Sequence, residues 1–315
     1  SALYGIWIAN YVAFNGDAMR GLAAQFLARA ERQGTRAPLL IAHRIMGISL
    51  AGTGDIVEGR AHFDQAMALY DPAEHRPLAT RFSVDSGVSV LSYRSWALWF
   101  LGYPEAALAD SDQAISDARE IGQAATLMYA LLHVSFTHIH CGNYATATGV
   151  LNELTGLAGE KGALFWKAHG TAQQGCLFGL IGKASNAVER LTSGITAFRL
   201  TGSTSWMPTR LSYLAKAYAD LDQFDEASRY IGEAMMAVET TKERWCEAEV
   251  NRIAGEIALK SPEPGVGKAE AYFERALAVA RQQQAKSWEL RAAMSMECQR
   301  RSNNASAGRS KNTSA

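Results

Sequence analysis

The chain has 315 residues, of which 48% are hydrophobic and 20% charged, and its 31 Lys and Arg residues balance 31 Asp and Glu residues. This is the composition of a globular protein, and zero net charge argues against nucleic acid as a direct partner, because phosphate binding needs an excess of basic residues. The four cysteines form no C-x-x-C pair, which excludes a disulfide scaffold and favours a reducing, cytoplasmic location.

The chain opens on an apolar segment from Leu3 to Phe14. This segment is shorter than the roughly 20 residues that a membrane-spanning helix needs. It also lacks the basic start of a signal peptide, because the first basic residue is Arg20. We therefore expect no membrane partner. The chain begins without Met and opens directly on this apolar segment, so we expect it to be a fragment whose N-terminal partner domains are missing.

Glycines recur at intervals of 20 residues along much of the chain. Gly34 and Gly54 show this interval first, and a longer series runs from residue 102 to residue 202. Glycine commonly follows the last turn of a helix, because it adopts the left-handed conformation without strain. The interval leaves room for a helix of about 16 residues, roughly 25 Å long. It predicts a row of antiparallel helices that end at Gly102, Gly122, Gly142, Gly162, Gly182 and Gly202.

The segments between these glycines have the periodicity of amphipathic helices. Leu211, Leu214, Ala215 and Tyr218 follow the i, i+3, i+4, i+7 pattern that places apolar side chains on one face. No alternating Val, Ile and Thr run is flanked by a hairpin turn. We therefore predict an all-α fold.

The true repeat is a pair of helices about 40 residues long. Small residues in the first helix of each pair recur at steps of 48, 40, 40, 40 and 40, and those in the second helix at steps of 48, 40, 40 and 40. The longer first step contains residues 71–77, whose two prolines disfavour a helix. Small residues allow neighbouring helix axes to approach closely. The first series is Gly47, Ser95, Ser135, Gly175, Ala215 and Gly255, and the second is Gly59, Ala107, Ala147, Ala187 and Ala227.

This pattern resembles the tetratricopeptide repeat, although the period is 40 residues rather than the usual 34. The unit from about Thr209 matches through Leu214, Ala215, Tyr218, Ala227, Ile231 and Ala234, and the unit from about Ile41 through Met46, Gly47, Leu50, Gly59, Phe63, Ala66 and Pro72. The resemblance implies a right-handed α-solenoid of antiparallel helix pairs. We expect residues 1–300 to form a single array of about seven pairs plus a final helix. Residues 301–315, rich in Ser, Asn and Lys, are predicted to be a disordered tail.

A narrower resemblance appears in residues 96–104, 243–249, 273–281 and 287–293. These stretches look like the C-terminal helical region of bacterial multidomain proteins, in which a class III adenylate or guanylate cyclase domain, or another output domain, precedes an AAA-type ATPase module. The resemblance implies signal transduction. It does not make this chain a cyclase.

Candidate catalytic motifs are weak. Gly265-Val266-Gly267-Lys268 resembles the end of a P-loop, but Pro262 replaces the first glycine and Ala269 the hydroxyl residue. We interpret it as an insertion between paired helices. A helical enzyme that uses residues 133–141 is a remote alternative, because only His138 and Cys141 there have the i, i+3 spacing of a metal pair. We expect no enzyme activity, cofactor or metal.

The remaining candidate site is the concave surface, which the first helix of each pair lines in tetratricopeptide arrays. The 40-residue register predicts an aromatic middle and a charged C-terminal end to this groove. For the tryptophans, burial in the core between repeats is the favoured alternative, and Trp166, Trp206, Trp245 and Trp288 are interpreted as structural. The predicted groove residues are Trp96, Trp99, Phe100, Tyr129, Phe136, His140, His169, Lys216, Asp220, Glu249, Arg252 and Glu256.

Two functions stay open from the sequence. The first is a non-catalytic protein-interaction module that regulates a cyclase or ATPase. Its partners would be proteins or peptides, among them other domains of the same polypeptide. The second is a receptor whose groove binds a small-molecule or peptide effector.

Overall fold

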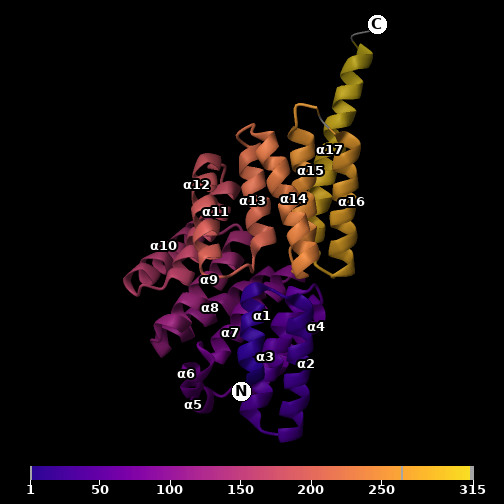
Figure 1. Ribbon diagram of the computed structural model, residues 1–315. Helices are drawn as coiled ribbons and strands as arrows, with labels where there is room; N and C mark the ends of the chain where they lie inside the picture. The colour runs from indigo at the N-terminus through magenta and orange to yellow at the C-terminus, as the bar shows by residue number, and fades with distance from the viewer. Residues whose placement is uncertain (1, 264, 313–315) are drawn as a thin grey trace.

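The regular secondary structure is helical throughout the part of the chain that the computed structural model describes, residues 2–263 and 265–312, with side chains described up to residue 301. Long helices form seven successive pairs and a final helix, with three short helical segments between the second and third pairs (Figure 1). In chain order they are α1 (Ala2–Ala13), α2 (Gly16–Gln33), α3 (Arg36–Gly52), α4 (Ile56–Leu69), α5 (Pro72–His75), η1 (Arg76–Leu78), α6 (Ala79–Phe82), α7 (Ser86–Phe100), α8 (Pro104–Ile121), α9 (Ala124–His140), α10 (Tyr144–Glu160), α11 (Leu164–Leu180), α12 (Ala184–Leu200), α13 (Met207–Ala219), α14 (Phe224–Thr241), α15 (Glu247–Lys260), α16 (Val266–Gln282) and α17 (Lys286–Asn312).

The glycine interval does mark the helix ends. All the glycines of the predicted series, with Gly34 and Gly54, have positive φ angles between 63° and 104°. Gly34 follows α2 in the left-handed conformation, and its N–H group donates to the carbonyls of Ala30 and Glu31. These bonds satisfy carbonyls that the helix itself leaves unpaired. The prediction of helices punctuated every 20 residues is confirmed.

The glycines of the 40-residue register are points of very close approach within a pair. A Cβ atom at Gly47 of α3 would lie 2.5 Å from the ring of Phe63 in α4, and one at Gly255 of α15 would lie 2.5 Å from the ring of Phe273 in α16. No side chain fits in these gaps without displacing a ring. The register read from the sequence therefore corresponds to real contacts between paired helices.

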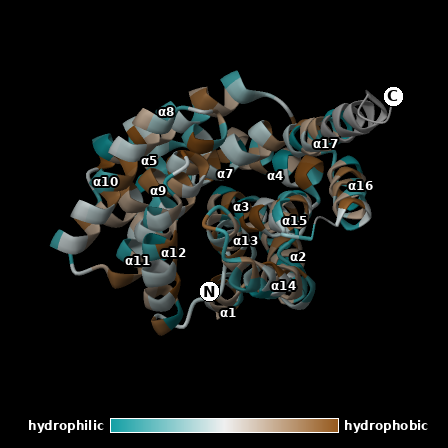
Figure 2. Ribbon diagram, turned by 90° about the horizontal axis from the view of Figure 1, so that it is seen from above, coloured by the Kyte–Doolittle hydropathy of each residue, from teal (hydrophilic) through white to brown (hydrophobic). Residues whose placement is uncertain are grey.

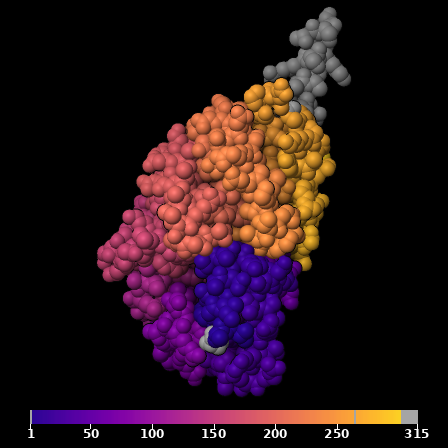
Figure 3. Space-filling view, in the orientation of Figure 1, coloured from indigo at the N-terminus to yellow at the C-terminus, as the bar shows by residue number. Residues whose placement is uncertain are grey.

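The array turns back on itself, so that its C-terminal part lies against its N-terminal part. Figure 1 shows α13 to α17 stacked on α1 to α4, and Figure 2 shows α8 to α12 as an arc on one side. In the space-filling view the first and last parts of the chain touch without a gap on the visible face (Figure 3). The turns before α13, α15 and α17 meet the C-terminal ends of α1, α3 and α7, and we call this contact the seam.

Backbone hydrogen bonds hold the seam. The carbonyl of Gly52, at the end of α3, accepts hydrogen bonds from the N–H groups of Arg244 and Trp245. The carbonyl of Val12, in α1, accepts two more from Thr204 and Ser205. Carbonyls near a helix C-terminus lack intrahelical partners, and at the seam the loop N–H groups supply those partners.

Two segments differ in detail from the sequence expectations. Residues 71–77 are not a plain loop, because Pro72 begins α5 and Pro77 lies in the first turn of η1. Proline is tolerated at the start of a helix, where its missing N–H group has no partner to lose. Helix α17 continues to Asn312, through much of the segment 301–315 predicted to be disordered. Residues 313–315 lie outside the described residues, and the disorder of this tail stays a prediction.

In the described part of the chain, no helix combines the length and the apolar character needed to cross a bilayer.

Candidate functional site

The five aromatic residues predicted to line the middle of the groove lie in the interior. Each has less than 9% of its surface exposed. They pack against tryptophans of the C-terminal half, which the seam brings into the concave side. Trp96 meets Trp206 edge to face with ring centroids 4.6 Å apart, and Trp99 meets Trp288 in the same way at 4.7 Å. The structure therefore places Trp96, Trp99, Phe100, Tyr129 and Phe136 in a core rather than along an open groove. For Trp96 and Trp99 this is the alternative weighed from the sequence, whereas for the other three it differs from the expectation.

The two predicted groove histidines are part of the same interior. His140 lies against the rings of Trp99 and Phe136, and burial lowers its pKa to about 3. The Nδ1 atom of His169 accepts a hydrogen bond from Nη2 of Arg210 at 2.5 Å, and burial holds its pKa well below the usual value. Both imidazoles are therefore neutral at physiological pH; His169 is buried, and His140 keeps part of its surface exposed.

The charged C-terminal end of the predicted groove is a real cavity. It has a volume of about 740 Å³ and lies between α13, α15, α16 and α17. We call it the C-terminal groove. Three of the predicted residues line it, namely Lys216, Asp220 and Glu256. Apolar side chains, among them Ile257 and Met294, complete its wall, and Met294 has 60% of its surface exposed.

Two ammonium groups share one carboxylate at the rim of the C-terminal groove. Nζ of Lys216 lies 2.6 Å from Oδ2 of Asp220, and Lys260 binds the other oxygen. Burial alone would raise the pKa of Asp220, but the hydrogen bonds from the two lysines outweigh burial and lower the pKa below its usual value. The carboxylate is therefore ionised, and one positive charge of the three groups remains in excess.

Glu249 and Arg252 lie beneath the groove rather than on its surface. Arg252 donates from Nε and Nη2 to the two oxygens of Glu249, at 2.7 and 2.9 Å, and Arg291 of α17 donates to the same carboxylate at 2.8 Å. Arg252 also binds Glu256. Burial would raise the pKa of Glu249, but the two guanidinium groups overcome it and hold the pKa well below its usual value. These ion pairs fix α15 against α17 and so position the wall of the groove.

Sequence reasoning missed three residues of this region: Lys260, Arg291 and Met294. Lys260 was within reach of the repeat, because it lies 40 residues after the predicted groove residue Asp220. Arg291 and Met294 were harder to assign, because the insertion before α16 shifts the register of the last helix. The spacing from Trp245 to Trp288 is 43 residues instead of 40.

The P-loop-like motif and two of the cysteines have surroundings that differ from those their chemistry needs. Gly265 and Lys268 stand at the start of α16, after helix α15, whereas a P-loop follows a strand. Burial raises the pKa of Cys141 to about 11 and that of Cys176 to about 12, which opposes formation of a nucleophilic thiolate. Among the residues described, no three His, Cys, Asp or Glu side chains are grouped so as to hold a metal ion.

No model of a known protein family matches the chain, and no curated protein matches it. Several solved structures do. A Rap protein complexed with competence and sporulation factor has a TM-score of 0.59 at 9% identity, over 96% of this chain and 97% of that one. The Rap conjugation gene regulator of plasmid pLS20, in complex with the Phr* peptide, has a TM-score of 0.55 at 10% identity, over 83% of this chain and 76% of that one.

A chain of the APC/C hetero-tetramer Cut9–Hcn1 has a TM-score of 0.56 at 15% identity, over 91% of this chain and 48% of that one, so the chain matches about half of its length. The fold is a TPR-like α-solenoid. At these identities the similarity establishes the fold alone, and a TPR-like array is what the glycine and small-residue registers predicted.

Proposed function

We propose that this TPR-like chain is a non-catalytic regulatory module that binds a peptide or protein segment in the C-terminal groove. The observation that carries the proposal is the combination of an exposed apolar wall with a charged rim in one cavity of about 740 Å³. Exposed apolar surface rimmed by polar groups is typical of interaction sites. The Rap neighbours, which were solved with the competence and sporulation factor and with the Phr* peptide, support a peptide as the occupant.

The groove favours a segment that carries an apolar side chain next to an acidic group. Met294 and Ile257 offer apolar contact, while the excess positive charge at Lys216 and Lys260 attracts a carboxylate. Each ammonium has three donors, and Asp220 occupies one donor of each. The remaining donors are available to a ligand.

The test is selection of peptides from a random phage-displayed library on the immobilised chain, followed by affinity measurement with the selected peptides. We expect Met294→Asp and Lys260→Glu to weaken binding at least tenfold. The matched control is Leu200→Asp, which adds a charge at a side chain that is 85% exposed on α12, outside the groove. Peptides that bind the wild type, the two groove variants and the control variant equally, or a library that yields no binder, would refute the proposal.

The parent context inferred from sequence is also part of the proposal. We infer that the module belongs to a cytoplasmic bacterial signalling protein, in which binding regulates a cyclase or ATPase domain of the same polypeptide. Support comes from the resemblance carried by residues 243–249 and 273–281. The gene that encodes the chain should contain such a domain upstream. ATP hydrolysis or cyclic nucleotide synthesis by the purified chain alone would contradict its role as a non-catalytic module.

A small-molecule effector is the alternative occupant of the C-terminal groove. Met294→Asp and Lys260→Glu should weaken the binding of such an effector as well. The effector would also displace the selected peptides, because both occupy the same groove. A thermal-shift screen of the wild type against Met294→Asp distinguishes this alternative, because only ligands of the groove stabilise the wild type selectively.

A further inference from the structure

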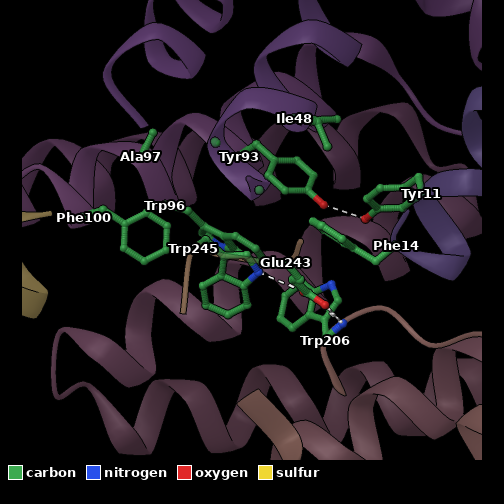
Figure 4. A pocket seen from close by; sticks show the side chains of 12 residues that line it. Tyr11, Phe14, Ile48, Tyr93, Trp96, Ala97, Phe100, Trp206, Glu243 and Trp245 are labelled. Atoms are coloured by element: carbon green, nitrogen blue, oxygen red, sulfur yellow. Dashed lines mark hydrogen bonds between the residues drawn. The ribbon is translucent and has the colours of Figure 1, made fainter. Parts of the chain in front are cut away.

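A small cavity lies at the seam, separate from the C-terminal groove. Its volume is about 20 Å³, which is enough for one water-sized group. Both halves of the array contribute to it: α1, α3 and α7 on one side, and the turns before α13 and α15 on the other (Figure 4). Aromatic rings make up most of its wall, and one carboxylate, that of Glu243, points among them (Figure 4).

Glu243 is a buried carboxylate with no cationic partner in contact. It has 0% of its surface exposed. Its oxygens accept hydrogen bonds from the backbone N–H of Trp206, at 2.9 and 3.0 Å, and from Nε1 of Trp245 at 2.9 Å. Both donors are neutral, and a carboxylate has about four acceptor sites. No Lys, Arg or His among the described side chains forms an ion pair with it; Arg210, which attracts it at longer range, binds His169 instead.

The rings around the carboxylate also favour positive charge. Trp206 and Trp245 lie 5.7 Å apart between centroids, and Trp96 lies 4.6 Å from the first and 5.9 Å from the second. Phe14 and Tyr93 close the cavity on the side of the N-terminal half. The faces of aromatic rings carry negative electrostatic potential, and tryptophan attracts a nearby cation most strongly. The carboxylate supplies the main attraction for a cation, and ring faces that border the cavity add to it.

The backbone around this cavity is strained. Phe14, Trp206 and Lys242 all have positive φ angles, of 44°, 66° and 62°, although none is glycine. Such conformations cost free energy and persist where the surrounding structure enforces them, often around ligands. At Trp206 the strained conformation accompanies the hydrogen bond from its N–H group to Glu243.

We propose that the seam cavity binds a primary ammonium group, that of the ammonium ion or of a short primary amine. The ammonium group would form an ion pair with Glu243 in the cavity that the three tryptophans help to line. The size of the cavity excludes a trimethylammonium head. Because both halves of the array line the cavity, the bound cation would fasten the seam.

Binding should depend on pH through Glu243. Burial raises the pKa of this carboxyl to about 7, so protons compete with the cation below that pH. The other titratable groups nearby do not change charge in this range. Burial raises the pKa of Tyr11 to about 12 and that of Tyr93 well above its usual value, and Arg210 stays charged because its pKa, although lowered by burial, is about 10. The pKa of Cys246 is raised well above its usual value by burial, and that of His133 is lowered to about 4.

The experiment is thermal unfolding of the full chain at pH 8 in methylammonium chloride, ammonium chloride, sodium chloride and tetramethylammonium chloride at equal ionic strength. We expect a rise in Tm of about 2 °C or more with the first two salts relative to the last two, with a matching change in tryptophan fluorescence. Glu243→Gln should abolish the difference between the salts. The control Glu256→Gln, which removes a carboxylate of the C-terminal groove, should retain it.

A second arm of the experiment needs no variant. In the wild type, the stabilisation by methylammonium should disappear between pH 8 and pH 6. Equal stabilisation by all four salts, an unchanged response in Glu243→Gln, or no response at pH 8 would each overturn the proposal, and the last would mean that the cavity holds water only. None of these outcomes depends on whether peptides bind the C-terminal groove.

Discussion

Replacement of Gly255 by alanine tests whether the 40-residue register marks the tightest contacts of the fold. A Cβ atom at this position would lie 2.5 Å from Cε1 of Phe273 and 2.8 Å from two further ring atoms. The ring cannot withdraw easily, because Phe273 is fully buried in a cluster that includes Ala292 and Met296 of α17. The new methyl group must therefore displace α16 from α15.

The magnitude follows from two opposing effects. Overpacking of a core typically costs about 1–3 kcal/mol, and three ring atoms within 3 Å place Gly255 towards the upper end. Replacing glycine by alanine within a helix returns roughly 1 kcal/mol through higher helix propensity. The net expectation is a loss of about 1–2 kcal/mol in the free energy of unfolding.

Gly232 is the matched control. It lies within α14, is exposed, and has no atom within 4 Å of an added Cβ. Gly232→Ala should therefore stabilise the chain by up to about 1 kcal/mol. Chemical unfolding followed by far-UV circular dichroism measures both variants. If Gly255→Ala raises the denaturation midpoint as Gly232→Ala does, α15 and α16 do not approach each other as closely at this position as the structure indicates.

Two further predictions concern the pH dependence of titratable side chains. Glu249→Gln should lower the free energy of unfolding by about 3–5 kcal/mol at pH 7, because it leaves Arg252 and Arg291 without their shared carboxylate. The wild type should lose this stabilisation as the pH falls below the unfolded pKa of about 4.3. An unfolding midpoint that the substitution leaves unchanged would refute the prediction. The imidazoles of His43 and His62 form a hydrogen bond between their Nδ1 atoms, which lie 2.8 Å apart, and burial lowers the pKa of both. The folded chain therefore prefers neutral imidazoles, and stability should fall as pH drops below about 6.5. His62→Gln should flatten this loss between pH 7.5 and 5.5, and an identical pH profile for the variant would contradict the assignment.

Much of the fold could be predicted because its signals are local. A glycine that ends a helix, such as Gly34, acts within one turn of the chain and needs no distant partner. The register at Gly47 and Gly255 reflects contacts within one helix pair, and a repeat array is built from contacts between neighbours. These patterns recur, so an error at one position does not change the interpretation.

The aromatic part of the predicted site could not be assigned from the sequence, because its burial depends on closure of the array. Trp96 would line a groove in an open solenoid. In this structure Trp206 covers it, held in place by contacts between segments far apart in sequence, such as the carbonyl of Val12 with the N–H of Ser205. Periodicity carries no information about such contacts. The charged residues Lys216 and Asp220 remained accessible because they lie at the C-terminal end of α13, whereas the seam forms at its N-terminal side.

Closure of the array divides its concave side into two environments that suit different ligands. Near the seam the interior is filled by aromatic rings, and the cavity beside Glu243 has a volume of about 20 Å³. At the opposite ends of α13 and α15 the surface opens into a groove of about 740 Å³. A peptide segment fits only the larger space, because the seam cavity admits no more than one small group such as an ammonium. Helix α15 connects the two environments, because Trp245 precedes its first turn and Lys260 ends its last. Helix α15 therefore spans the distance from the aromatic interior at the seam to the rim of the C-terminal groove.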